Sequence, residues 1–94
     1  MTLKLRNDVV LEKIAGSYLL VALRSAWGVC PFAIQISPFA ACIWKGILDG
    51  LSEDEIIDFL CREKSMDQER ARHVFTHFIK AAKDYHYLLP EDET

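Results

Sequence analysis

The stretch that decides the fold is residues 37–55, which read SPFAACIWKGILDGLSEDE. Ser37 can accept a hydrogen bond from an orphan backbone amide, and Pro38 loses no useful donor at the first helical position. Gly50 can take the left-handed conformation that closes a helix. The stretch therefore predicts a helix that starts at Ser37-Pro38 and stops at Asp49-Gly50.

Two further helices are predicted downstream. Ser52 stands three residues before Glu55, which is the spacing of a capping box. Apolar residues then recur at helical spacing as far as Cys61. Asp67 is the next N-cap candidate, and the apolar residues of 68–85 keep helical spacing for about five turns. The last of these helices should be the longest.

The residues before Ser37 have the pattern of β-strands. Val9–Ile14 and Tyr18–Leu23 are rich in β-branched and apolar residues and flank Ala15-Gly16-Ser17, so we expect a hairpin. Phe32–Ile36 is a third strand candidate, after a loop at 24–31. The predicted fold class is α+β and winged-helix-like: a three-stranded antiparallel sheet followed by three helices.

Length and composition indicate one globular domain. The chain has 94 residues, of which 51% are hydrophobic and 27% charged, values near the globular average. We expect residues 1–94 to form a single domain, with a core at about 9–89 and an acidic tail at 90–94. No apolar run is long enough to span a bilayer and no signal peptide is evident, so a cytoplasmic protein without membrane contact is expected.

Charge is unevenly distributed along the chain. The net charge is −3, yet residues 70–83 carry four basic side chains and no acid. A winged-helix DNA-binding regulator could use such a helix, but the acids before it and in the tail would repel phosphate, so no nucleic acid is expected as a partner. An acidic peptide would still be attracted. A third interpretation is that the four basic residues of 70–83 are ordinary solvent-exposed charges without a binding role.

No pattern of catalytic or metal-ligating residues is evident. His73 and His77 are four residues apart and share a helix face, but no acid lies between them and no third ligand is indicated. The sequence has no Gly-rich phosphate loop and no nucleophile elbow. We therefore expect no metal, no cofactor and no catalytic residue, and we expect a protein that is not an enzyme.

The cysteines are spaced too widely for a zinc ribbon or a disulfide framework. Reduced thiols are expected. Cys42 and Cys61 fall in apolar patterns and are predicted to be small buried hydrophobes. Cys30 lies in the loop before the third strand and could be exposed.

The third strand candidate and the loop before it could form an interaction surface. Phe32–Ile36 has no charged residue and only Gln35 as a polar group. If it lies at the sheet edge, its unpaired backbone groups could accept a peptide as an added strand; otherwise it is core or is covered by a neighbour. Trp27 in the preceding loop is either a binding hot spot or a lid on the core.

The order of features from Phe32 to Leu60 resembles the PqqD family. The features are an apolar strand, a polar turn, a helix with IW at 43–44, LDGLS at 48–52, and a capped helix with IIDFL at 56–60. The resemblance extends from about Val9 to Leu89. In the family a Gly commonly closes the last helix, whereas this chain has Tyr85-His86-Tyr87, and His tolerates the left-handed conformation.

The resemblance implies a RiPP recognition element, which binds the leader of a ribosomally made precursor peptide. The leader would add as a strand beside the third strand and lie against the third helix. A separate maturase, often a radical S-adenosylmethionine enzyme, would then act on the core peptide. The candidate peptide-binding residues are Phe32, Ala33, Ile34, Gln35, Ile36, Arg70, His73, Val74, His77 and Phe78.

The chemistry of the candidate side chains on the third helix suggests what each would do in peptide binding. On the helical wheel, Val74 and Phe78 would form the apolar floor of the groove, while Arg70, His73 and His77 could meet leader acids. A monomer or a homodimer is expected. In the remaining alternative, a structural or oligomerising subunit, the third strand pairs with its own copy instead of a leader.

Overall fold

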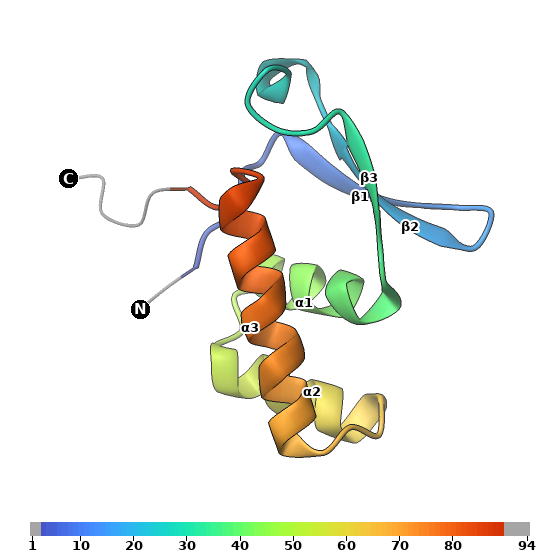
Figure 1. The fold of residues 1–94 in the computed structure, drawn as a ribbon, viewed down its shortest axis with the longest axis vertical. Helices are drawn as coiled ribbons and strands as arrows, with labels where there is room; N and C mark the ends of the chain where they lie inside the picture. Colours follow the sequence, from blue (N-terminus) through green and yellow to red (C-terminus); the bar gives the residue numbers. More distant parts are fainter. Residues whose placement is uncertain (1–2, 90–94) are drawn as a thin grey trace.

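The structure, a computed structural model, describes residues 3–89, so the predicted tail at 90–94 lies outside the described residues. Its elements are strands β1 (Val9–Ile14) and β2 (Ser17–Ala22), a short 3-10 helix (Arg24–Ala26), strand β3 (Ala33–Ile36), and helices α1 (Pro38–Leu48), α2 (Glu53–Glu63) and α3 (Gln68–Asp84) (Figure 1). The predicted α+β, winged-helix-like fold is confirmed.

The three strands form one antiparallel sheet in the order β1-β2-β3. Ala15 and Gly16 both have positive φ, as the two central residues of a tight hairpin turn require. β2 begins and ends one residue earlier than predicted, because Leu23 leaves the strand to cap the 3-10 helix. β3 begins at Ala33 and has a neighbour on one side only.

The helices begin where the sequence predicts, because their caps are local. The Ser37 hydroxyl accepts from the Ala40 amide at 3.1 Å. Ser52 and Glu55 form both bonds of a capping box, and the Asp67 carboxylate caps α3. No helix within residues 3–89 is long and apolar enough to cross a membrane.

One hydrophobic core joins the sheet to the helices, with α1 at its centre. Ile43 and Trp44 of α1 are fully buried, together with Leu20 of β2 and Leu60 of α2. The Trp44 ring meets Tyr87 edge to face, with 5.6 Å between ring centroids. In Figure 1 the helices pack below the sheet, and α3 rises until its last turn reaches the sheet.

The segment after α3 turns back sharply and pairs with the start of the chain. His86 has a φ of 65°, the left-handed value that the sequence tolerates at this position. The Tyr87 amide donates to the Ala82 carbonyl at 2.8 Å, and the Tyr87 carbonyl accepts from the Arg6 amide at 2.9 Å. These bonds fix the Tyr87 ring beneath the sheet.

Cys30 is buried, so the expectation that it could be exposed is wrong. Only 8% of the residue is accessible, and its thiol lies 3.4 Å from the His86 carbonyl oxygen, which accepts its hydrogen bond. Burial raises the pKa of this thiol. The loop folds back onto the end of α3, a long-range contact that no local pattern reveals. Cys42 and Cys61 are partly buried against the core, and all three thiols are free.

Candidate functional site

An apolar groove lies between β3 and the stretch of α3 from His73 to Ala82. Its volume is about 500 Å³, and it is open to solvent. Leu20 and Tyr87 contribute to it from the sheet and from the segment after α3, and Phe39 contributes from the start of α1. We call this feature the β3–α3 groove.

The β3 wall of the groove is an open sheet edge. The Ala22 amide donates to the Phe32 carbonyl at 2.9 Å, and Ile34 and Ile36 pair with β2 in the same register. Because antiparallel partners alternate, the backbone N–H and C=O groups of Ala33 and Gln35 point away from β2. No strand among residues 3–89 pairs with these groups, which could therefore act as the template for an added strand.

The α3 wall combines an apolar base with a polar rim. Val74 and Phe78 line the groove, with Phe78 buried and Val74 half-buried. His73 and His77 are exposed, and their rings stack with 6.5 Å between centroids. The structure therefore places these four side chains along the groove side of α3.

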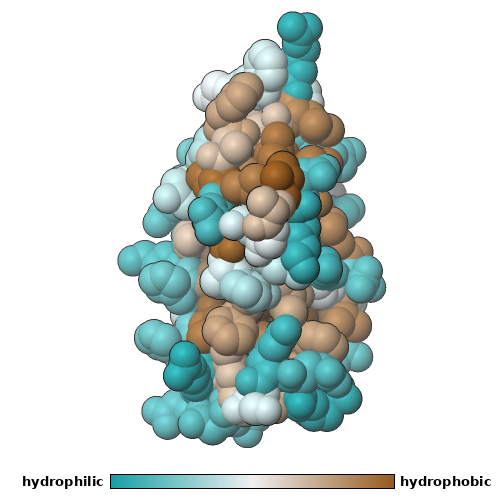
Figure 2. Space-filling model, turned by 90° about the vertical axis from the view of Figure 1, so that its right-hand side faces the viewer, coloured by the Kyte–Doolittle hydropathy of each residue, from teal (hydrophilic) through white to brown (hydrophobic). Residues whose placement is uncertain are grey.

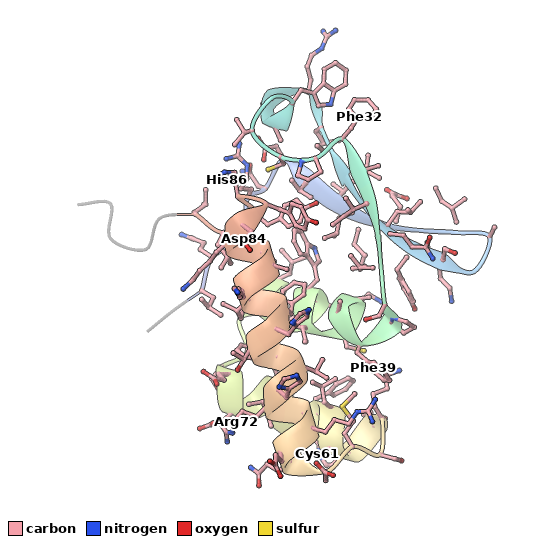
Figure 3. The ribbon with its side chains drawn as sticks, in the orientation of Figure 1. Phe32, Phe39, Cys61, Arg72, Asp84 and His86 are labelled. Atoms are coloured by element: carbon pink, nitrogen blue, oxygen red, sulfur yellow. The ribbon has the colours of Figure 1, made fainter. Side chains whose placement is uncertain are left out.

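Three of the candidate residues do not line the groove. Ala33 contributes only its backbone edge, and Phe32 lies beyond the end of the groove at the top of the sheet, far from Phe39, as Figure 3 shows. Arg70 is at the first turn of α3, where it lines a separate hollow that also includes Phe39 and Met66. The structure thus brings Ile34, Gln35 and Ile36 together with the four α3 residues.

Several groove residues were missed by sequence reasoning. Leu20, Phe39 and Tyr87 come from segments far apart in the chain, and only the tertiary fold brings them together. Tyr85, at the C-cap of α3, lies 5.9 Å from Tyr87 between ring centroids. The two tyrosines that flank His86 were the sequence feature that could have indicated an aromatic contribution to the groove from this segment.

The groove has no metal-binding cluster among residues 3–89, because no three His, Cys, Asp or Glu side chains lie close enough to hold an ion. His73 and His77 are exposed at the rim of the groove, where each ring can donate or accept a hydrogen bond.

Comparison with known proteins finds a matching fold but no matching sequence family. The fold superposes on a lasso peptide synthetase B1 complexed with the leader peptide, with a TM-score of 0.76 and 22% identity over 96% of this chain and 100% of that chain. TbiB1 in complex with the TbiA(beta) leader peptide matches with a TM-score of 0.73 and 21% identity over 96% and 99% of the two chains.

The chain has the fold of these two leader-bound proteins. No protein-family model and no curated protein matches its sequence. The likeness extends over nearly the whole of all three chains, so the sheet and the helices belong to one shared fold.

Tyr87 has an unusual hydroxyl at the base of the groove. The hydroxyl is buried without a hydrogen-bond partner among the described residues. Burial raises the pKa of Tyr87 to about 12, so the folded protein holds this proton at a pH where an unfolded tyrosine, with a pKa of about 10, has lost it.

We expect the stability contributed by Tyr87 to be complete below about pH 10 and to be lost as pH rises toward 12. Tyr87→Phe keeps the ring without a titrating group, so its free energy of unfolding should fall less steeply above pH 10 than that of the wild type. Urea denaturation at a series of pH values measures this, with Tyr85→Phe as the exposed control. Parallel pH profiles for wild type and Tyr87→Phe would contradict it.

Proposed function

We propose that this chain binds the leader segment of a ribosomally made precursor peptide as an added strand along β3 and presents it to a modifying enzyme. The observation that carries the proposal is the open edge of β3 beside an apolar groove of about 500 Å³. A strand paired with Ala33 and Gln35 would place alternate side chains in that groove.

Backbone pairing and side-chain burial would have different tasks. Hydrogen bonds to the Ala33 and Gln35 backbone would supply affinity that does not depend on leader sequence. Apolar leader side chains would enter the space over Ile34, Val74 and Phe78, and the fit of those side chains would supply specificity.

The comparisons support this assignment. Both solved structures share the fold across nearly all of the chain, and both are complexes with a leader peptide. This chain keeps the two features that such binding needs, a free strand edge and an adjoining apolar groove.

Charge on α3 favours acidic leader residues. His73 and His77 lie on the groove rim, and Arg70 lies one turn before them. Arg72, in contrast, points toward Glu53 of α2, with 3.8 Å between Nη1 and Oε2. The acidic start of α2 beside α3 disfavours a phosphate backbone, so we prefer a peptide to DNA as the ligand.

The proposed role is binding, and the chemistry would belong to a separate maturase, such as a radical S-adenosylmethionine enzyme. We propose no cofactor for this chain. The three free thiols fit a reducing compartment, so we place the protein in the cytoplasm, where precursor peptides are made. β3 pairing between two copies is the alternative use of the same edge.

Introducing a charge at the bottom of the groove tests whether the leader binds there. Once genomic context has identified a precursor peptide, Val74→Glu should weaken binding of its synthetic leader by roughly tenfold or more, because one leader side chain would meet a buried charge. Isothermal calorimetry measures the affinity. Thr76→Glu adds the same charge on an exposed part of α3 that faces away from the groove, and should leave affinity unchanged. Equal affinities for the two variants would exclude the groove as the site.

The strand edge is tested by removing one outward N–H. Gln35→Pro deletes a donor that β2 does not use, which edge strands tolerate. Leader affinity should fall roughly tenfold or more, while Gln35→Ala, which keeps the amide, should bind within about twofold of wild type.

Light scattering with and without leader shows whether β3 pairs with a second copy. A dimer that leader does not dissociate would argue for the oligomerising role.

A further inference from the structure

An exposed pair of aromatic rings lies where the chain enters β3. The Trp27 and Phe32 rings are 5.1 Å apart between centroids, and the residues are 48% and 67% exposed. Leu23 and Val29, in the same connection between β2 and β3, are also exposed. Figure 2 shows brown, apolar residues in the upper half of the molecule, over the sheet.

The pair is held in a fixed position. Trp27 Nε1 donates to the Ala22 carbonyl at 3.0 Å. Asp8 fastens the start of the connection: its carbonyl accepts from the Leu23 amide at 2.8 Å, and its carboxylate accepts from the Ser25 hydroxyl at 2.7 Å. An aromatic side chain that is already ordered loses little conformational entropy when a ligand covers it.

The pair continues the line of the β3–α3 groove. Phe32 pairs with Ala22 in the register that also pairs Ile34 with Leu20, so Phe32, Ile34 and Ile36 project from the same face of the strand. Ile34 and Ile36 line the groove, whereas Phe32 extends beyond it. A peptide lying along the open edge would pass over Ile36, Ile34 and Phe32 in turn.

We propose that the peptide strand occupying the groove, an inference that rests on the proposed function, continues past Ile34 and places a further apolar or aromatic side chain on Trp27 and Phe32. Alternate residues of a strand are about 6.6 Å apart, so two more peptide residues reach the pair. The recognised segment is therefore longer than the groove alone.

The positive charge of Arg24 beside the Trp27–Phe32 pair favours an acidic residue at the neighbouring peptide position. The Arg24 guanidinium lies 5.5 Å from the centre of the Trp27 ring, and Arg24 forms no ion pair within residues 3–89. A peptide acid next to the apolar side chain would meet this cation. The inferred ligand is an extended segment with an apolar residue flanked by Asp or Glu.

The size of the surface favours a peptide over a folded protein. A stable protein interface uses roughly 20 to 30 residues on each side, whereas this patch consists of a few side chains on one connection. A single peptide side chain can cover two rings. The modifying enzyme is the competing occupant, and the experiment includes it.

The fluorescence of Trp27 can report whether a ligand covers it, because the chain has two tryptophans and the other, Trp44, is fully buried. Acrylamide quenches the exposed indole, so quenching of the wild type reports Trp27. Saturation with the same synthetic leader that is used in the calorimetry should lower the quenching constant at least twofold. In Trp27→Phe, which retains only Trp44, the leader should change quenching little.

Affinity tests the same contact independently. Trp27→Ala and Phe32→Ala should each weaken leader binding by roughly tenfold, as truncated aromatic hot spots do. Leu48→Ala removes another exposed apolar side chain, at the end of α1 outside the groove, and should not change affinity. An alanine scan of the leader should find one apolar position whose substitution weakens binding to wild type but not to Trp27→Ala.

The outcomes separate this inference from the proposed function. If the leader binds with an affinity sensitive to Val74→Glu, yet Trp27 stays fully quenchable and Trp27→Ala binds normally, the inference fails and the groove remains. If the purified modifying enzyme protects Trp27 and the leader does not, the pair belongs to the enzyme and the inference is overturned. If no leader binds the wild type, both proposals fail.

Discussion

The packing of Trp44 against Tyr87 is the contact on which the groove depends. Trp44 anchors α1 in the core, and Tyr87 belongs to the segment that follows α3, so their edge-to-face contact ties the end of α3 to the middle of α1. Backbone bonds from Tyr87 to Arg6 and Ala82 complete the attachment. This attachment sets where the last turn of α3 lies relative to β3, and it therefore positions the α3 wall of the groove.

The open edge of β3 exposes the protein to unwanted strand pairing, and the short length of β3 limits that risk. An exposed, uncharged strand invites pairing with any extended chain, and proteins usually protect such edges with charge, proline or a cover. β3 has only four residues, Pro38 follows it at the start of α1, and α3 stands beside it. An incoming strand can therefore pair over a short length only, and the groove must supply the rest of its binding energy.

The parts of the fold that sequence predicts are those set by local chemistry. The caps at Ser37, Ser52 and Asp67 act within three residues, so the helix starts could be read directly. The resemblance to the PqqD family pointed to the third helix, and helical periodicity then predicted that Val74 and Phe78 share one face of it. The burial of Cys30 and the floor from Tyr87 depend on contacts between segments far apart in sequence, which no periodic pattern encodes.

The loop before β3 combines residues that the core buries with an aromatic residue that the core leaves exposed. Its buried members, Ala26 and Cys30, close the top of the core, and this leaves Trp27 outside, bonded to the Ala22 carbonyl and resting on Phe32. Trp27 is 48% exposed and lies outside the buried core cluster, which favours a contact role for this residue over a lid on the core. A large aromatic residue that folding does not require to be buried, yet that folding holds rigid, has the properties of a preformed contact surface.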